Sequence, residues 1–217
     1  KGVAQDRIRT TTYIEYGGQP PLPEERVSAA ERRDGPRAAM IASAIALMSE
    51  RGVAATSFRD VLEHSGAPRG SIYHHFPGGK AQLVEEATDR AATRIERSLT
   101  AKVDGLGVVD TVRAVVDLWR EGLVATDYVA GCPVVAAGLG TEPRARARAG
   151  EAFDTFVDVV ARSLVADGVG AERARSLANL VIAALEGALV VAQAQRSPAP
   201  LDAVVAELEV LLAPVVG

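Results

Sequence analysis

The segment SGAPRGSIYHHFPGGK, residues 65–80, concentrates side chains that can form hydrogen bonds in a chain otherwise rich in Ala, Val and Leu. It holds two of the three histidines and one of the three lysines. On a helical wheel at about 100° per residue, Ile72 and Phe76 fall together, as they would if they held a short helix against its neighbours. The opposite side carries a glycine, two hydroxyl groups and an imidazole: Gly70, Ser71, Tyr73 and His74. This side can therefore approach a polar partner closely.

Two of these side chains suit the edges of nucleic-acid bases. Arg69, at the start of the predicted helix, can donate two hydrogen bonds to guanine O6 and N7, a pairing that discriminates against other bases by roughly 1–3 kcal/mol. His74 can contact either a base edge or a phosphate. A glycine at position 70 lets the backbone come close to the partner.

Other side chains in and near this segment can bind phosphate oxygens, which position a protein on DNA without reading its sequence. Ser71 and Tyr73 can donate hydrogen bonds through their hydroxyls, and Lys80 can neutralise a phosphate as a point charge. Thr56 and Ser57 lie at the start of the preceding predicted helix, where free backbone amides also favour an anion.

The spacing of helix signals around this segment predicts a helix-turn-helix. In TSFRDVLEHSG, Ser57 and Asp60 form a capping-box pattern, and Gly66 predicts the end of that helix. A short turn then leads to the predicted helix of residues 69–76. The second helix of such a pair can enter the major groove of DNA.

Glycine and proline divide the rest of the chain into longer helical segments. The predicted helices cover residues 80–101, 109–126, 132–138, 142–166, 171–195 and 201–212. A further helix, opened by Asp34 and Pro36 and ended by Gly52, completes an all-α fold of about nine helices. We expect three parts: a flexible arm (1–31), a helix-turn-helix DNA-binding domain (32–80) and a larger helical bundle (81–217).

The net charge of −4 argues at first against a nucleic-acid partner, but the charge is unevenly distributed. Residues 32–80 carry seven Arg and Lys against four Asp and Glu, whereas residues 81–217 carry 13 against 19. A small basic module on an acidic body can bind DNA while the rest of the surface stays off it. The single cysteine indicates a reducing, cytoplasmic compartment. The apolar stretch SLANLVIAALEGALVVAQAQ is interrupted by Asn179 and Glu186, so we expect no membrane span.

The positions of the histidines and the cysteine do not favour metal binding, catalysis or redox sensing. His74 and His75 could pack in any helical bundle or bind a metal ion, but helix neighbours point about 100° apart and His64 has no ligand spacing with them. No histidine follows position 75 to act as a catalytic base, and no phosphate-binding glycine loop occurs. We therefore expect no enzyme, metal site or cofactor. Cys132 could be a redox sensor, although a small buried side chain is the simpler interpretation.

The segment TSFRDVLEHSGAPRGSIYHHFPGGKAQL resembles the DNA-binding segment of the tetracycline-repressor (TetR) family of bacterial transcription regulators. The shared features are the Thr-Ser cap, the turn at Gly66, the Gly-Ser/Thr-aliphatic-Tyr-x-His-Phe run and the following lysine, within residues 36–83. The resemblance implies base contacts from Arg69, Gly70 and His74. It also implies contacts to the DNA backbone from Ser57, Ser71, Tyr73, His75 and Lys80. The segment GCPVVAAGLG (131–140) resembles a subgroup with Gly-Cys-Pro at the start of its sixth helix.

In this family the larger bundle binds a small effector and pairs two chains, and the resemblance implies the same here. The large rings and neighbouring aliphatic residues of the bundle are the expected lining of an apolar pocket: Trp119, Leu123, Val124, Tyr128, Val135, Leu139, Phe153 and Phe156. The same side chains could simply fill the core. The last two helices carry more apolar surface than one outward face needs, so we expect them to form a homodimer interface.

Together these features predict a sequence-specific regulator of transcription, a repressor that a small apolar effector releases from a palindromic operator on double-stranded DNA. An activator of the same architecture would have the same sequence features. The main alternative from another class is a ligand-binding or interaction protein whose helix-turn-helix no longer binds DNA. Arg7 and Arg9 of the arm are compatible with minor-groove contacts or with none.

Overall fold

The computed structural model describes residues 35–68, 70–103 and 105–213, and these form nine α-helices and no β-strand. The all-α prediction is therefore confirmed for the described part of the chain. Three features of the sequence prediction lie outside it: the arm of residues 1–31, the expected helix cap Asp34, and Arg69.

The first two helices begin and end where local signals place them. α2 (Pro36–Arg51) has a proline in its first turn. α3 (Phe58–Ser65) begins with the predicted capping box, in which the Ser57 hydroxyl accepts a hydrogen bond from the Asp60 amide while the Asp60 carboxylate accepts one from the Ser57 amide. Gly66 ends α3 with φ of +69°, in the left-handed region that glycine adopts most easily.

α4 (Ile72–His75) is shorter than the predicted helix of residues 69–76. The Pro68 carbonyl accepts hydrogen bonds from both the amide (3.0 Å) and the hydroxyl (2.6 Å) of Ser71, so a turn stands where the helix was expected to start. At the other end Phe76 leaves helical geometry (φ −130°, ψ 70°), because the proline after it disfavours the helical conformation.

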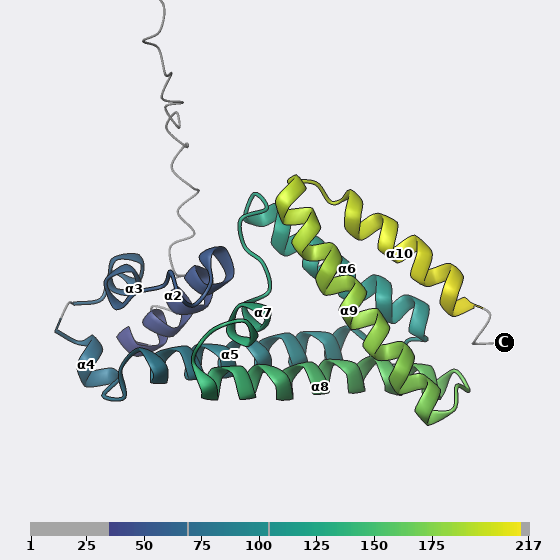
Figure 1. Cartoon of the computed structure of the whole chain (residues 1–217), viewed down its shortest axis with the longest axis horizontal. Helices are drawn as coiled ribbons and strands as arrows, with labels where there is room; N and C mark the ends of the chain where they lie inside the picture. The colour runs from purple at the N-terminus through teal and green to yellow at the C-terminus, as the bar shows by residue number, and fades with distance from the viewer. Residues whose placement is uncertain (1–34, 69, 104, 214–217) are drawn as a thin grey trace, which may run out of the picture.

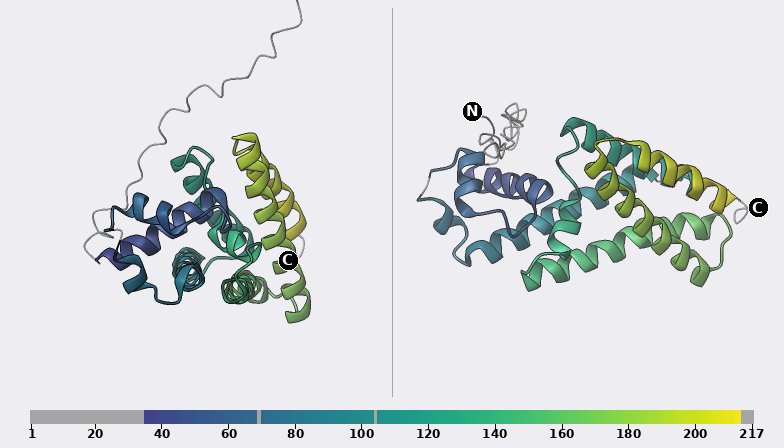
Figure 2. Two further views of the ribbon diagram at one scale, coloured as in Figure 1. Left: turned by 60° about the vertical axis from the view of Figure 1, so that its left-hand side comes forward. Right: turned by 45° about the horizontal axis from the view of Figure 1, so that its top comes forward.

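The bounds of the six remaining helices agree with the predicted segments to within a few residues. These helices are α5 (Gly79–Val103), α6 (Val108–Ala125), α7 (Pro133–Gly138), α8 (Pro143–Ala166), α9 (Ala171–Gln195) and α10 (Ala199–Leu212). In Figure 1, α2, α3 and α4 form a head at one end, and α5 runs from this head into the body without a break. α8 lies alongside α5, and α9 packs against both α8 and α10 (Figures 1 and 2).

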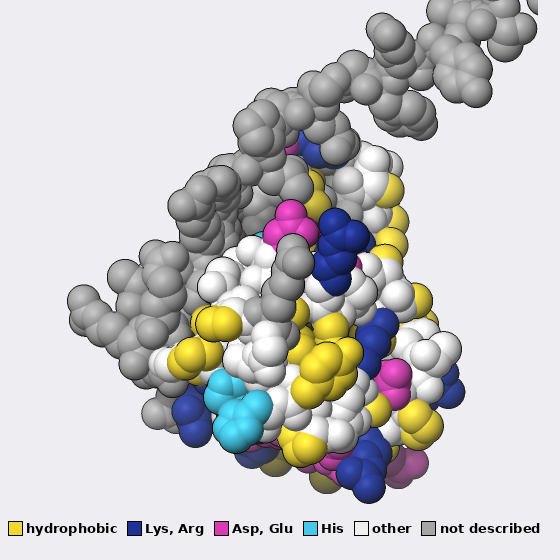
Figure 3. All heavy atoms as spheres, turned by 90° about the vertical axis from the view of Figure 1, so that its left-hand side faces the viewer, with side chains coloured by type: hydrophobic (Ala, Val, Ile, Leu, Met, Phe, Trp, Pro, Cys, Tyr) yellow, Lys and Arg dark blue, Asp and Glu magenta, His cyan; other side chains and the backbone are white. Residues whose placement is uncertain are grey.

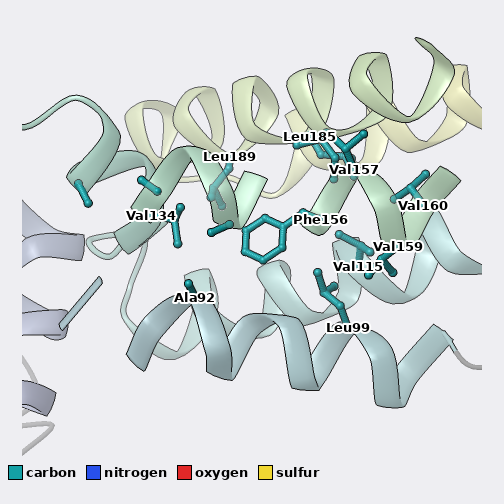
Figure 4. Packing of buried hydrophobic residues seen from close by; sticks show 14 of the residues in the cluster. Ala92, Leu99, Val115, Val134, Phe156, Val157, Val159, Val160, Leu185 and Leu189 are labelled. Carbon is teal, nitrogen blue, oxygen red and sulfur yellow. The ribbon is translucent and has the colours of Figure 1, made fainter. Parts of the chain in front are cut away.

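The core of the body gathers around Phe156 of α8, which is 2% exposed. Figure 4 shows its ring among aliphatic side chains from four other helices, including Ala92, Leu99, Val115, Val134, Leu185 and Leu189. Where α8 meets its neighbours, the buried side chains are often small, as at Ala145, Ala149 and Ala152. Small side chains let helix axes approach closely, which explains why an alanine-rich chain can pack a dense bundle.

α9 is long and apolar enough to cross a membrane, by length and composition alone. One side of it, including Leu177, Val181 and Leu185, is buried in the bundle, where the helix packs against α8 and α10. Its apolar composition is therefore that of a core helix, with a second apolar side left exposed.

Candidate nucleic-acid interface and ligand pocket

α4 is fixed to the head on one side and presents the other side to solvent. Ile72 and Phe76 are buried, at 1% and 0% exposure, which confirms their predicted packing role. The Arg37 guanidinium lies over the Phe76 ring, 5.1 Å from its centroid. Tyr73 is 69% exposed, and its ring meets the ring of Phe58 edge-on with the centroids 5.6 Å apart. These contacts on two sides set the rotation of α4 about its own axis.

The exposed side of α4 carries the paired imidazoles. His74 is exposed and His75 is half-buried, and their rings meet edge-on at 5.3 Å. Gly70 is exposed, with open space where a Cβ would stand. Figure 3 views this end of the molecule and shows histidine side chains at the surface, with lysine and arginine side chains at several points around them. A partner approaching this end can therefore reach the imidazole of His74.

The two serine hydroxyls expected to bind phosphate are engaged within the protein. The Ser57 hydroxyl donates to the carboxylate of its own capping box at 2.6 Å, and the Ser71 hydroxyl donates to the Pro68 carbonyl at 2.6 Å. Both hydrogen bonds are at the surface, so a phosphate oxygen can replace either acceptor. The Lys80 ammonium lies 3.4 Å from the Ala54 carbonyl, which holds its charge near the start of α3.

Thr56 does not present its side chain as expected. It is 3% exposed, its hydroxyl donates to the Gly52 carbonyl at 2.9 Å, and its amide donates to the Val53 carbonyl at 3.3 Å. These bonds close the turn between α2 and α3. The sequence pattern could not distinguish this threonine from a free cap, because both precede the helix.

Arg59 is an additional cation that the sequence pattern did not bring out. It is exposed in the first turn of α3, and it forms no ion pair within the described ranges. Arg51 differs, because its guanidinium is paired with Asp60 at 3.2 Å. The available signal was the basic residue two positions after the cap in TSFRD, close in sequence to the other candidate phosphate ligands.

His64 joins two helices of the head. Its Nδ1 lies 3.0 Å from the hydroxyl of the buried Ser43, so the ring links α3 to α2. Among the residues that the structure describes, no group of three His, Cys, Asp or Glu side chains is arranged to hold a metal ion. The position of His64 is thus explained by packing within the head.

A cavity of about 290 Å³, here called the head–body cavity, lies where the head meets the body. Its walls come from α2, α5, α6, α9 and the segment before α7, and its lining includes Ile45, Ser49, Ala91, Arg94, Ile95, Ser98, Trp119, Leu123, Cys132 and Leu189. The amide of Gly131, also in the lining, donates a hydrogen bond of 2.8 Å to the Ser49 carbonyl. A ligand in this cavity would touch both parts of the molecule.

Only some of the predicted pocket residues line this cavity. Trp119 and Leu123 do, whereas the following do not: Val124, Tyr128, Val135, Leu139, Phe153 and Phe156. Leu139 and Val124 face solvent at 82% and 58% exposure, and Phe153 meets the core residue Phe156 edge-on at 5.9 Å. Tyr128 and Val135 are half-buried. Phe156 instead fills the centre of the core, where a large ring is needed most (Figure 4), and the identity of the residues that contact an effector stays a prediction.

Cys132 caps the start of α7, and its thiol lies beside the carboxyl group of Glu186 on α9. Both carboxyl oxygens are buried, and neither has a hydrogen-bond partner among the described residues. Burial raises the pKa of Glu186 from 4.5 to about 7. Burial, together with the neighbouring carboxylate, also raises the pKa of the Cys132 thiol. At neutral pH the thiol is therefore protonated and a poor nucleophile, which does not favour a redox role.

Known proteins resemble the chain in both of its parts. Residues 40–87 match the model of the bacterial regulatory proteins of the tetR family, and residues 108–207 match the C-terminal domain of LmrA/YxaF-like transcriptional regulators. The HTH-type transcriptional regulator Rv0196 of Mycobacterium tuberculosis is 42% identical over 186 residues, which cover 82% of this chain and 94% of the relative. The HTH-type transcriptional repressor Rv3405c of the same organism is 40% identical over 67 residues, or 31% of this chain and 35% of that protein.

A solved structure shows the same architecture. The crystal structure of a TetR transcriptional regulator from Chloroflexus aurantiacus matches with a TM-score of 0.69 and 28% sequence identity, covering 84% of this chain and 96% of that one. The chain therefore belongs to the TetR family of DNA-binding transcriptional regulators. Within that family, its body matches the LmrA/YxaF-like type. The resemblance to a Gly-Cys-Pro subgroup stays a prediction.

Proposed function

We propose that this regulator is a homodimeric repressor that reads a palindromic operator and is released by a small effector. The observation that carries the proposal is the placement of α4. Its buried residues hold it rigidly on the head, while Tyr73 and His74 stand exposed on the side that faces outward. A rigid helix with donors on its free side is what major-groove binding requires.

Roles for individual residues follow from their positions. Gly70 and His74 would face base edges, since they lie just before and on the exposed side of α4. The family resemblance implies the same role for Arg69, which lies outside the described residues. Ser57, Ser71, Tyr73, His75 and Lys80 would contact the DNA backbone, and we add Arg59 to this group. Thr56 is left out, because its hydroxyl is already bonded to the turn before α3.

The last two helices carry an exposed aliphatic surface, which we call the α9–α10 face. It consists of Leu180, Val190 and Val191 on α9 and Val210 and Leu211 on α10, each between 41% and 71% exposed. Gly187 lies between these α9 residues with open space where a Cβ would stand, so another helix could approach closely. A second copy related by a two-fold axis would cover this surface and place two heads about one DNA turn apart, roughly 34–36 Å.

Release by an effector is supported by where the head–body cavity lies. Ile45 and Ser49 belong to α2 of the head, whereas Trp119 and Leu123 belong to the body. Suppose that the chain has two conformations that differ in the distance between the head wall and the body wall of this cavity. A ligand that binds one conformation more tightly increases its population, by no more than the difference between its two affinities. Two heads no longer at groove spacing would leave the operator.

The experiment is a selection of random duplex DNA by the purified full chain at two salt concentrations, with Arg175→Ala and a His74→Ala variant in parallel. We expect enrichment of a palindrome, weaker at the higher salt. Arg175→Ala should select the same palindrome, because its guanidinium pairs with Asp154 and Asp158 on the body. His74→Ala should lose preference at one position in each half-site.

Failure of the folded, dimeric chain to enrich any duplex would contradict the proposal. That outcome would favour the alternative of a ligand-binding or interaction protein whose head no longer reads DNA. Enrichment of a single half-site without two-fold symmetry would contradict the dimeric part alone.

A further inference from the structure

The lining of the head–body cavity differs in polarity between its inner wall and its edge. Ala91, Leu123 and Leu189 are apolar and buried, at 3%, 1% and 5% exposure, and the ring of Trp119 also contributes to the wall. Arg94 lines the same cavity but is exposed to solvent. The cavity therefore combines an apolar interior with a cation at the boundary to water.

Two hydrogen-bond donors of α5 face the cavity without a partner. Within the residues that the structure describes, Arg94 forms no ion pair or hydrogen bond, and the hydroxyl of Ser98 forms no hydrogen bond. Residues four apart in sequence are neighbours on one side of a helix, so the guanidinium and the hydroxyl can act on one ligand group. Arg148 of α8 shows the contrast, because it is paired with Asp89 at 2.7 Å.

The two other hydroxyl groups of the lining are already bonded within the protein. The hydroxyls of Ser49 and Thr126 each donate to a carbonyl of the preceding helical turn at 2.9 Å. The described lining contains no aspartate or glutamate. Glu186, beside Cys132, keeps both carboxyl oxygens buried and does not line the cavity. A cationic ligand would thus meet a positive charge with no accessible carboxylate to balance it.

We infer that the effector is an amphipathic monocarboxylic acid, with its apolar chain or ring against Leu123 and Trp119 and its carboxylate on Arg94 and Ser98. A guanidinium can donate two parallel hydrogen bonds to a carboxylate, and the hydroxyl one turn away can add a third. The cavity volume of about 290 Å³ lies at the small end of ligand pockets, which span roughly 300–1,000 Å³. It therefore suits a short chain or a single ring. This inference rests on the proposed function, because it names the chemistry of that effector.

Trp119 provides the readout, because it is the only tryptophan of the chain and lines the cavity. Octanoate and phenylbutyrate are titrated into the full chain, each beside its uncharged analogue, octanamide or phenylbutyramide, with octylamine as the cationic probe. At low salt the acids should bind at least about tenfold more tightly than the amides. The difference should shrink as salt is added, because the Arg94 guanidinium is exposed and is screened.

Three variants assign the effect. Arg94→Met should bring acid and amide to equal affinity, whereas Arg94→Lys should retain a preference for the acid. Arg97→Met is the control, because Arg97 is exposed on the same helix and does not line the cavity. The inference is overturned by equal binding of acid and amide to the unmodified chain, by a preference that survives Arg94→Met, by tighter binding of octylamine, or by no binding of any probe.

The duplex selection keeps this inference separate from the proposed function. If the chain selects a palindrome but binds octanoate and octanamide equally, the proposed repressor function stands and the carboxylate site is rejected. Binding of octanoate through Arg94 by a chain that selects no duplex would do the reverse.

Discussion

The backbone amide of Gly131 donates a hydrogen bond of 2.8 Å to the carbonyl of Ser49, and this bond joins the segment before α7 to the end of α2. Gly131 also lies close to α9. A Cβ at this position would lie 2.6 Å from Oε1 of Gln193, whose amide nitrogen donates to the Val129 carbonyl at 3.0 Å. Gly131 thus fits between the head and α9, and only a residue without a side chain leaves all these contacts in place.

Gly131→Ala should destabilise the chain by about 1 kcal/mol, because the new methyl displaces Gln193 and breaks its hydrogen bond to Val129. Denaturant unfolding at a fixed protein concentration measures the change. In a Gln193→Ala background, which removes the obstructing side chain, the same substitution should cost almost nothing. An equal cost in both backgrounds would show that Gln193 is not the cause.

Arg69→Ala should relax base preference at one position of each half-site by roughly 1–3 kcal/mol while leaving stability unchanged. Selection of random duplex DNA by this variant measures the change directly. If the selected sequence keeps every preferred base, Arg69 does not read the groove, and Gly70 and His74 remain as the candidates.

Lys80→Ala and Arg59→Ala should each weaken binding to all sequences and lower the slope of log affinity against log salt by about one, because each side chain is expected to neutralise one phosphate. Arg175→Ala, on the body, should leave the slope unchanged. Fluorescence anisotropy with one labelled duplex across a salt series gives the three slopes. An unaltered slope for either variant removes that residue from the DNA contacts.

If the chain dimerises through the α9–α10 face as proposed, Val210→Glu should yield a monomer, because Val210 is 71% exposed on that face and a charge there would be buried without a partner in the dimer. Leu139→Glu is the matched control, since Leu139 is 82% exposed but lies on the short α7–α8 connection. Sedimentation velocity distinguishes the two states. If Leu139→Glu and not Val210→Glu causes dissociation, the interface includes the α7–α8 connection and not the α9–α10 face.

The buried carboxyl of Glu186 predicts a dependence of stability on pH. Its pKa is raised from 4.5 to about 7 in the folded chain, so the unfolded state loses its proton first as the pH rises. Stability should therefore fall between these two values and level off above the higher one, by a total on the order of 3 kcal/mol. Glu186→Gln cannot ionise and should remove this decline. Unfolding curves at about pH 5 and about pH 8 test it, and a parallel decline in the glutamine variant would assign the effect to another group.

Short-range signals predicted the helices well, because they act within one or two turns. The capping box of Ser57 and Asp60 is present as expected, and the spacing of Ile72 and Phe76 correctly identified the buried side of α4. The predicted length of α4 was wrong. The helix starts later than expected because the Ser71 hydroxyl donates a hydrogen bond to the Pro68 carbonyl, which stabilises a turn in place of the first helical residues.

The cavity could not be predicted in the same way. Ser49 and Trp119 are far apart in sequence, and their shared cavity exists only once α2, α5 and α6 are packed. Arg94 has the sequence context of an ordinary surface arginine on a charged helix. What sets it apart is that it forms no ion pair among the described residues and lines a cavity without a carboxylate, which only the packed structure reveals.

α5 is one continuous helix with Lys80 in its first turn and Arg94 on the cavity wall. At 1.5 Å per residue these two positions are roughly 21 Å apart along the axis, so a tilt of about 10° at the cavity moves Lys80 by roughly 4 Å. If an effector changes the width of the cavity as proposed, the helix would act as a lever that converts this change into a displacement of the head. In a two-fold dimer the two heads would move in opposite directions, so the distance between the recognition helices would change by twice the displacement of one head. A rearrangement too small to disturb the core would then be large enough to lose registry with successive major grooves.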